Sequence, residues 1–167
     1  WAKVERESAG KALHTYRHVL NDPGADPRRT WLVVTVLSSL GYSQEALVAA
    51  EAVTDVLGEV GDTGLATTAL LAQAGMRGSA GQPAEGLRLV DRALIALRRA
   101  GDRRGELSGL DSRVRLLSAL GRRQEELAGL AELETLSREL GDVRVQAECG
   151  VKRAHLLEDE GRSGEAL

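Results

Sequence analysis

The chain has 167 residues, about the length of one ordinary domain, and 43% of them are hydrophobic. Its formal net charge is −3 and its pI is near 5.7, which excludes the strongly basic character of most nucleic-acid-binding domains. A single cysteine, Cys149, excludes an internal disulfide framework, and no apolar run approaches the length of a membrane span. We therefore expect neither nucleic-acid nor membrane binding by this chain.

The core has to be built from small aliphatic side chains, because Phe is absent and the aromatic residues are two Trp and two Tyr. Ala, Leu and Val suit close helix–helix contacts better than a sheet. The sequence also begins without Met and stops inside a repeated motif. We expect it to be a piece of a larger protein.

Two short motifs recur every 40 residues along the chain. One starts with glycine and closes with Glu-x-Leu, and it is written GYSQEAL from Gly41, GQPAEGL from Gly81, GRRQEEL from Gly121 and GRSGEAL from Gly161. The other ends in Gly-Asp, at 60–62, 100–102 and 140–142. A fixed period of this length is typical of helical hairpins that stack into a solenoid, in which each unit buries its face against its neighbours.

The first predicted helix covers 2–20 and contains the motif HTYRH. His14 and His18 lie one turn apart on it, a spacing that two metal ligands can share. Zinc catalysis also needs a third ligand and normally a Glu base, and the HExxH pattern is missing. We therefore expect two histidines on a helix surface and no metal site.

The segment NDPGADP at 21–27 precedes a second helix over 27–40, which Asp26 should cap and Pro27 should open. A third helix over 42–60 follows. The Gly-Asp motif is expected to end one helix and begin the next. Glycine at the C′ position tolerates a positive φ, and an aspartate at the N-cap accepts free N–H groups. The aspartates expected to cap in this way are Asp62, Asp102 and Asp142.

Five more helices complete the chain, over 62–80, 82–100, 102–120, 122–140 and 142–160. Apolar residues fall three and four apart in them, as Leu107, Leu110, Val114 and Leu117 do, which indicates amphipathic helices. No segment shows the alternation that is typical of a strand. The expected fold is all-α, with about eight antiparallel helices.

Three other features look chemical but fit the helical frame. GMRGSAG at 75–81 lacks the Lys-Ser/Thr of a phosphate-binding loop. RRAGDRR at 98–104 straddles a helix junction, where arginine favours the preceding C-terminus and Asp102 the following N-terminus. Cys149 is expected to be a buried, inert thiol. No nucleophile–base pair is visible, so we expect no enzyme activity and no cofactor.

With its turn glycines, the Glu-Ala-Leu or Glu-x-Leu that follows them and its Gly-Asp junctions, the chain resembles the tetratricopeptide repeat (TPR) family in a 40-residue form. The resemblance covers nearly the whole chain. It implies a right-handed α-solenoid that forms one domain over 1–167, with a leading helix at 2–20. The repeat units would span about 22–60, 62–100, 102–140 and 142–167.

One column of the repeat departs from the bulky first-helix residues that the family prefers, and it consists of Val33, Gln73, Arg113 and Arg153. Either the two arginines extend their charged ends from half-buried stems, or the local packing differs from the usual repeat.

The first helix of each hairpin lines a concave groove in this family, which implies the helices at 27–40, 62–80, 102–120 and 142–160. At its start Trp31 would be an aromatic anchor, unless it is a core residue. Small residues in the middle would leave a hollow, unless they reflect composition alone. At the end, cations beside acidic residues would suit a carboxylate or phosphate, unless they form an ordinary solvated surface. The candidate groove residues are Arg28, Trp31, Thr35, Thr68, Leu71, Ala72, Gly75, Asp111, Ser112, Arg115, Lys152 and His155.

The function that the resemblance implies is protein or peptide binding, as a sensor or scaffold arm of a larger cytoplasmic regulatory protein. Families that grip chaperone tails use a carboxylate clamp of Lys and Asn, and here the Asn column consists of Thr35, Gly75, Arg115 and His155. A chaperone-tail ligand is therefore not expected. One alternative is a homodimer that forms through an end face carrying Val151, Leu156 and Leu157. Another is an accessory part of an enzyme.

Overall fold

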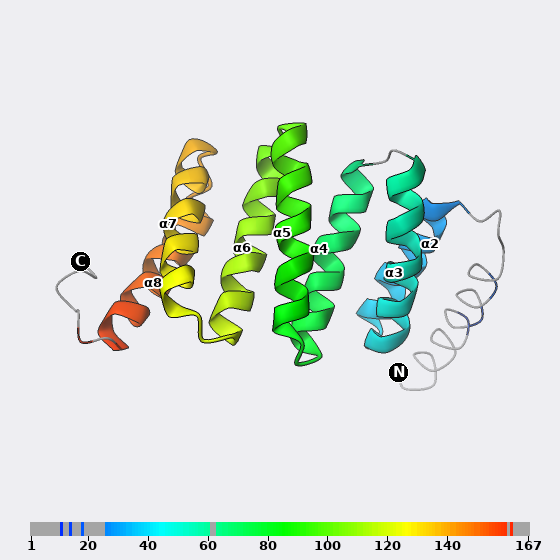
Figure 1. The fold of residues 1–167 in the computed structure, drawn as a ribbon, viewed down its shortest axis with the longest axis horizontal. Coiled ribbons are helices and arrows are strands. Elements are labelled where there is room, and N and C mark those ends of the chain that lie inside the picture. The colour runs from blue at the N-terminus through cyan, green and yellow to red at the C-terminus, as the bar shows by residue number, and fades with distance from the viewer. Residues whose placement is uncertain are drawn as a thin grey trace.

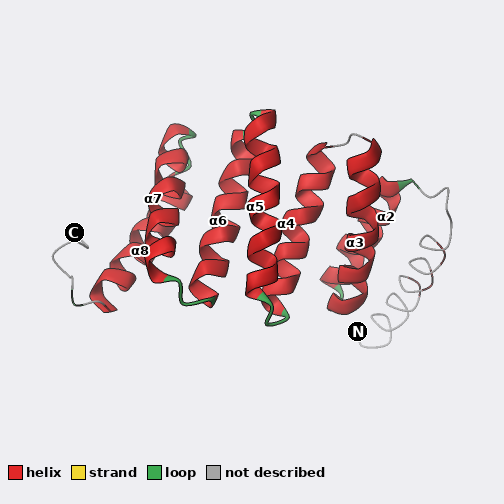
Figure 2. Cartoon of the chain, in the orientation of Figure 1, coloured by secondary structure: helices red, strands yellow, loops and turns green. Residues whose placement is uncertain are grey.

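The computed structural model describes residues 26–60, 63–159 and 161, together with Lys11, His14 and His18. The helices in these residues are α2 (Pro27–Ser39), α3 (Ser43–Val60), α4 (Thr63–Ser79), α5 (Pro83–Ala100), α6 (Arg103–Ala119), α7 (Arg123–Glu139) and α8 (Val143–Asp159). Helices are the only regular elements in the described part of the chain, which confirms the all-α class (Figure 2). The helix predicted over 2–20 lies outside it, apart from the three exposed helical positions Lys11, His14 and His18.

The helix bounds agree with the predicted ones to within one residue at each end, because the turn chemistry is as expected. The glycines that follow α2, α4, α5, α6 and α7 have φ values between 65° and 84°, a left-handed conformation that disfavours other residues. At the start of α6, the Asp102 carboxylate accepts a hydrogen bond from the Gly105 N–H at 2.8 Å. The predicted N-caps that the structure describes are formed by Asp26, Asp102 and Asp142.

The helices stand side by side in a row that runs from α2 to α8 (Figure 1). Each of them packs against the next in the chain, and α4 also packs against α6. Consecutive helices run in opposite directions, because only short turns join them (Figure 1). Helices α3, α5 and α7 form one layer, with α2, α4, α6 and α8 behind them in this view.

The core consists of one large apolar cluster from α4 to α8 and smaller clusters around α2, α3 and α4. Leucines at helical spacing dominate the large cluster, and Leu110, Leu117 and Leu130 are at most 1% exposed. Alanines dominate the contact between α2 and α3, where Ala46 and Ala50 are fully buried. Such small side chains allow two helices to approach closely.

In two of the Glu-x-Leu motifs the middle residue lies at a close contact with the preceding helix. In α5 this residue is Gly86, where an added Cβ would lie 2.7 Å from the Ala74 carbonyl oxygen of α4. In α3 it is Ala46, which is fully buried. In these two units the position therefore holds a residue with no more than a methyl side chain, whereas α7 has Glu126 there.

Three members of the unusual column, Gln73, Arg113 and Arg153, link their helices to the preceding one. The Arg113 Nε donates to Asp91 on α5 at 3.0 Å, and the Arg153 Nη1 donates to Glu134 on α7 at 2.9 Å. Both arginines are half-buried. The first of the two interpretations is therefore correct, and the charged ends reach carboxylates on the neighbouring helix. Gln73 is buried instead, and its Nε2 donates to the Ala50 carbonyl oxygen on α3 at 2.8 Å.

Candidate functional site

All candidate groove residues reach the surface at least in part. The exposed ones are Arg28, Thr35, Thr68, Gly75, Arg115 and His155. The half-buried ones are Trp31, Leu71, Ala72, Asp111, Ser112 and Lys152. Five of them, Leu71, Gly75, Ser112, Arg115 and Lys152, line two hollows that adjoin along α6.

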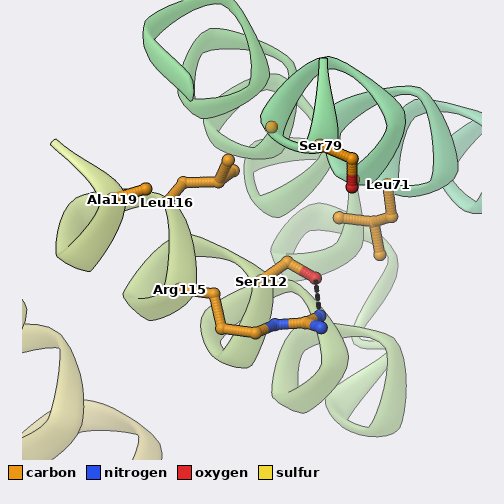
Figure 3. Close-up of a pocket in the computed structure, with 8 residues that line it drawn as sticks. Leu71, Ser79, Ser112, Arg115, Leu116 and Ala119 are labelled. Atoms are coloured by element: carbon orange, nitrogen blue, oxygen red, sulfur yellow. Dashed lines mark hydrogen bonds between the residues drawn. The ribbon is translucent and has the colours of Figure 1, made fainter. Parts of the chain in front are cut away.

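The first hollow lies between α4 and α6 and has a volume of about 210 Å³ (Figure 3). Two glycines of α4 create it in different ways. An added Cβ at Gly78 would lie 2.8 Å from Leu116 Cδ2, so the leucine of α6 already packs against that position. A Cβ at Gly75 would have no neighbouring atom within 4 Å, so this glycine opens the hollow. The lining residues are Leu71, Gly75, Gly78, Ser79, Ser112, Arg115, Leu116 and Ala119.

The second hollow lies where α6, α7 and α8 meet and has a volume of about 330 Å³. Its lining residues are Val114, Arg115, Ser118, Ala119, Glu126 and Lys152. Arg115 and Ala119 line both hollows, so the surface continues across α6 from α4 to α8. An extended ligand that crossed α6 would contact both of them.

The cations of this surface are held by one carboxylate. Asp111 lies 3.4 Å from the Arg115 Nε and 3.5 Å from the Lys152 Nζ. The Arg115 Nη2 also donates to the Ser112 hydroxyl at 3.2 Å (Figure 3). Exposed ion pairs of this kind contribute only about 0–1 kcal/mol. The two cations can therefore turn to a ligand carboxylate or phosphate with little loss.

At the α2 end, Trp31 is half-buried and packs against two apolar clusters, one around Val34 and one around Leu57. It therefore serves in the packing of α2 on α3 and α4. Leu32 and Val36, also on α2, are apolar residues that are 64% and 45% exposed.

The remaining candidates lie outside the two hollows. The hydroxyls of Thr35 and Thr68 donate to carbonyl oxygens of their own helices, at 2.7 Å and 2.9 Å. Ala72 and His155 lie on α4 and α8 without lining either hollow. Arg28 is exposed near the start of α2.

Seven residues that line the two hollows are not among the twelve candidates, and they are Gly78, Ser79, Val114, Leu116, Ser118, Ala119 and Glu126. Leu116 and Ala119 look like ordinary members of an amphipathic helix. Glu126 does carry a signal, because GRRQEEL has Glu where GYSQEAL and GQPAEGL have Ala46 and Gly86. The pattern of the repeat alone does not say where that carboxylate points.

A chain of ion pairs joins α5, α6 and α7 and involves Arg98 and Arg103, two of the four arginines in RRAGDRR. Glu106 is only 5% exposed, and it accepts from the Arg98 Nε and the Arg103 Nη1, both at 2.7 Å. Arg98 also pairs with Glu132, and Arg103 with Glu139. The hydrogen bond to Glu106 raises the pKa of Arg98 above its ordinary value. The predicted capping by Asp102 is confirmed, and these ion pairs add to it.

Cys149 is buried at 2% exposure, as predicted. Burial raises the pKa of its thiol above the ordinary value, which disfavours the reactive thiolate. His14 and His18 are exposed helical positions. The described residues contain no group of three or more side chains that could hold a metal ion.

The end face predicted from Val151, Leu156 and Leu157 is only partly exposed. Val151 is 57% exposed, but Leu157 is buried at 5% and Leu156 packs against the large cluster. The predicted end face is therefore wrong for the two leucines, which pack within the chain. Val143, at 73% exposure, adds to the apolar surface of α8.

Among the described residues, no helix combines the length and the apolar character needed to cross a membrane. No family model and no curated protein matches the chain.

Proposed function

We propose that the chain is a TPR-like, right-handed α-solenoid whose groove along α2, α4, α6 and α8 binds an extended peptide or protein segment. The 40-residue period of the sequence coincides with helix pairs, which supports the solenoid. The observation that carries the function is the pair of adjoining hollows along α6. Its setting is an arm of a larger cytoplasmic regulatory protein.

The two hollows suit different parts of a ligand. Leu71 and Leu116 give the first hollow an apolar floor, while Ser112 and Arg115 provide donors at its rim. An aliphatic side chain placed there would contribute about 1.5–3 kcal/mol if it were fully buried. A nearby acidic side chain would then reach Arg115 or Lys152.

One such anchor is not enough for stable binding. Association costs about 4–15 kcal/mol of translational and rotational freedom, so several anchors have to act together. A segment that runs from the second hollow past α4 to Leu32 and Val36 on α2 supplies them. The groove therefore selects an extended ligand that has aliphatic residues towards α2 and an acidic residue at α6.

The test is a selection of displayed random peptides on the wild-type chain, followed by affinity measurements on the variants Arg115→Glu, Gly75→Gln and Arg92→Glu. Arg115→Glu reverses a charge of the rim, and Gly75→Gln fills the first hollow without a clash, because that position faces open space. Both should weaken the selected peptides at least about tenfold, or about 1.4 kcal/mol. Arg92, exposed on α5, is the matched control and should have no effect.

If all three variants bind the peptides with the affinity of the wild type, the groove is the wrong surface. Loss of affinity only in Arg92→Glu would place the binding on the opposite layer. Unfolding curves of each variant would show whether a lost affinity comes from a lost fold.

A second candidate is self-association through α8, favoured by the exposure of Val143 and Val151 on that helix. Two copies that bury these valines against each other would form a homodimer. Sedimentation of wild type and Val151→Glu over a range of concentrations tests it. A concentration-independent monomer in the wild type would rule it out.

A further inference from the structure

Glu126 departs from its repeat in a way that the fold does not need. It occupies the position of Ala46 and Gly86, where the helix approaches its predecessor and the other units have small residues. Its residue exposure is only 5%. Within the described residues, its carboxylate forms neither a hydrogen bond nor an ion pair, although its backbone N–H donates to Arg122.

The neighbouring unit shows how unusual this is. Glu106 is equally buried, at 5%, but it accepts hydrogen bonds from Arg98 and Arg103. Burying a carboxylate without a partner is unfavourable, and buried polar groups are nearly always satisfied. A buried carboxylate that the described residues leave unsatisfied can therefore gain a partner from a bound molecule.

The second hollow gives such a partner access. In the described part of the chain, Arg77 Nε is the only side-chain N or O atom that is both sealed from solvent and without a partner. The Glu126 oxygens therefore keep some contact with solvent, and the residue lines the hollow of about 330 Å³. A molecule that enters this hollow can reach them.

Arg115 and Lys152 line the same hollow, and both contact Asp111 rather than Glu126. The hollow thus presents the carboxylate of Glu126, which has no partner among the described residues, beside two cations that share the single carboxylate of Asp111. A purely cationic ligand would be repelled by Arg115 and Lys152, and a purely anionic one by Glu126. A group that carries a positive and a negative charge side by side can pair with Glu126, Arg115 and Lys152 together.

We propose that this hollow binds a free α-amino acid by its zwitterionic head, with the ammonium on Glu126 and the carboxylate on Arg115 and Lys152. Charge-assisted hydrogen bonds of this kind are the strong ones. The Ser118 hydroxyl is a further polar group of the lining. Val114 and Ala119 form an apolar wall, so the ligand is an amino acid with an aliphatic side chain. This goes beyond peptide binding in the groove and does not depend on it.

The test is calorimetric titration of the whole chain with leucine, N-acetyl-leucine and leucinamide. N-acetylation removes the ammonium and amidation removes the carboxylate, while both keep the side chain. Leucine should bind with saturation, and each derivative should bind at least about tenfold more weakly. Glu126→Gln should weaken the binding of leucine by a similar factor. Glu125→Gln is the matched control, because that carboxylate pairs with Arg122 in the same turn, outside the hollow, and it should leave the affinity unchanged.

Several results would overturn the proposal. If leucinamide binds with the same affinity as leucine, only the positive charge is recognised. If N-acetyl-leucine binds with the same affinity as leucine, only the negative charge is recognised. The proposal is also wrong if leucine gives no saturable heat at millimolar concentration, or if Glu126→Gln leaves its affinity unchanged. Gly75→Gln, which fills the first hollow, should weaken the binding of the selected peptides but not that of leucine. The peptide-binding proposal and the amino-acid proposal can therefore be tested independently.

Discussion

Two glycines on neighbouring helices, Gly75 on α4 and Gly86 on α5, should respond oppositely to the same substitution. Replacing a glycine inside a helix by alanine restricts the unfolded chain and stabilises the helix by about 0.5–1 kcal/mol. At Gly75 nothing opposes this gain, because no atom lies within 4 Å of the added Cβ. We expect Gly75→Ala to stabilise the chain by about that amount.

At Gly86 the same methyl group meets α4 and α6. Its Cβ would lie 2.7 Å from the Ala74 carbonyl oxygen and 3.0 Å from the Leu116 Cδ2. The leucine can turn away, but a backbone oxygen moves only with its helix, so α4 and α5 would have to separate. Overpacking of this kind costs about 1–3 kcal/mol, which outweighs the gain in helix propensity. Gly86→Ala should therefore destabilise the chain.

The free energy of unfolding of wild type and both variants would be measured by urea denaturation, with circular dichroism as the signal. Thermal unfolding is a second measurement, in which a change of 1 kcal/mol in a chain of this size shifts Tm by about 2–4 °C. Stabilisation by both substitutions would show that α4 and α5 are further apart than described. Destabilisation by Gly75→Ala would show that position 75 does not face open space.

Three more predictions concern single side chains. Asp102→Ala should lower the free energy of unfolding by about 0.5–2 kcal/mol, since it removes the N-cap of α6, and equal midpoints in denaturant would contradict the cap. Glu126→Ala should raise that free energy by about 1–3 kcal/mol, because it removes a buried carboxylate without a partner; a loss of stability would point to a partner for it within the chain. Burial raises the pKa of Cys149 above its ordinary 9.0, so the unfolded chain loses the proton first and this contribution to stability disappears as the pH rises above about 9. Alkylation should accordingly be slow in the folded chain, and labelling as fast as in urea would contradict the burial.

The helices could be predicted because their ends are encoded locally. Glycine with a positive φ ends a helix and aspartate caps the next one, and both act within a few residues. The junction between α5 and α6 at Gly101 and Asp102 shows this directly. The spacing of the apolar residues predicted which side of each helix faces the core, since the core of a helical repeat follows the helical period.

The hollows could be predicted only in outline. Gly75 and Gly78 look alike in the sequence, yet one faces open space and the other is covered by Leu116, which lies 38 residues after Gly78 on another helix. Ion pairs such as Arg113 with Asp91 likewise depend on where distant side chains meet. Glu126 was visible as an irregularity of the motif, but its lack of a partner is a property of the packed structure.

The most direct test of the peptide-binding groove is to map where a selected peptide contacts the chain by nuclear magnetic resonance. The isotope-labelled chain would be titrated with the peptide while the amide shifts are followed. We predict the largest shift changes at Leu71, Gly75, Ser112 and Arg115, with smaller ones on α3, α5 and α7. Changes concentrated on α5 and α7, with α4 and α6 unaffected, would contradict this prediction.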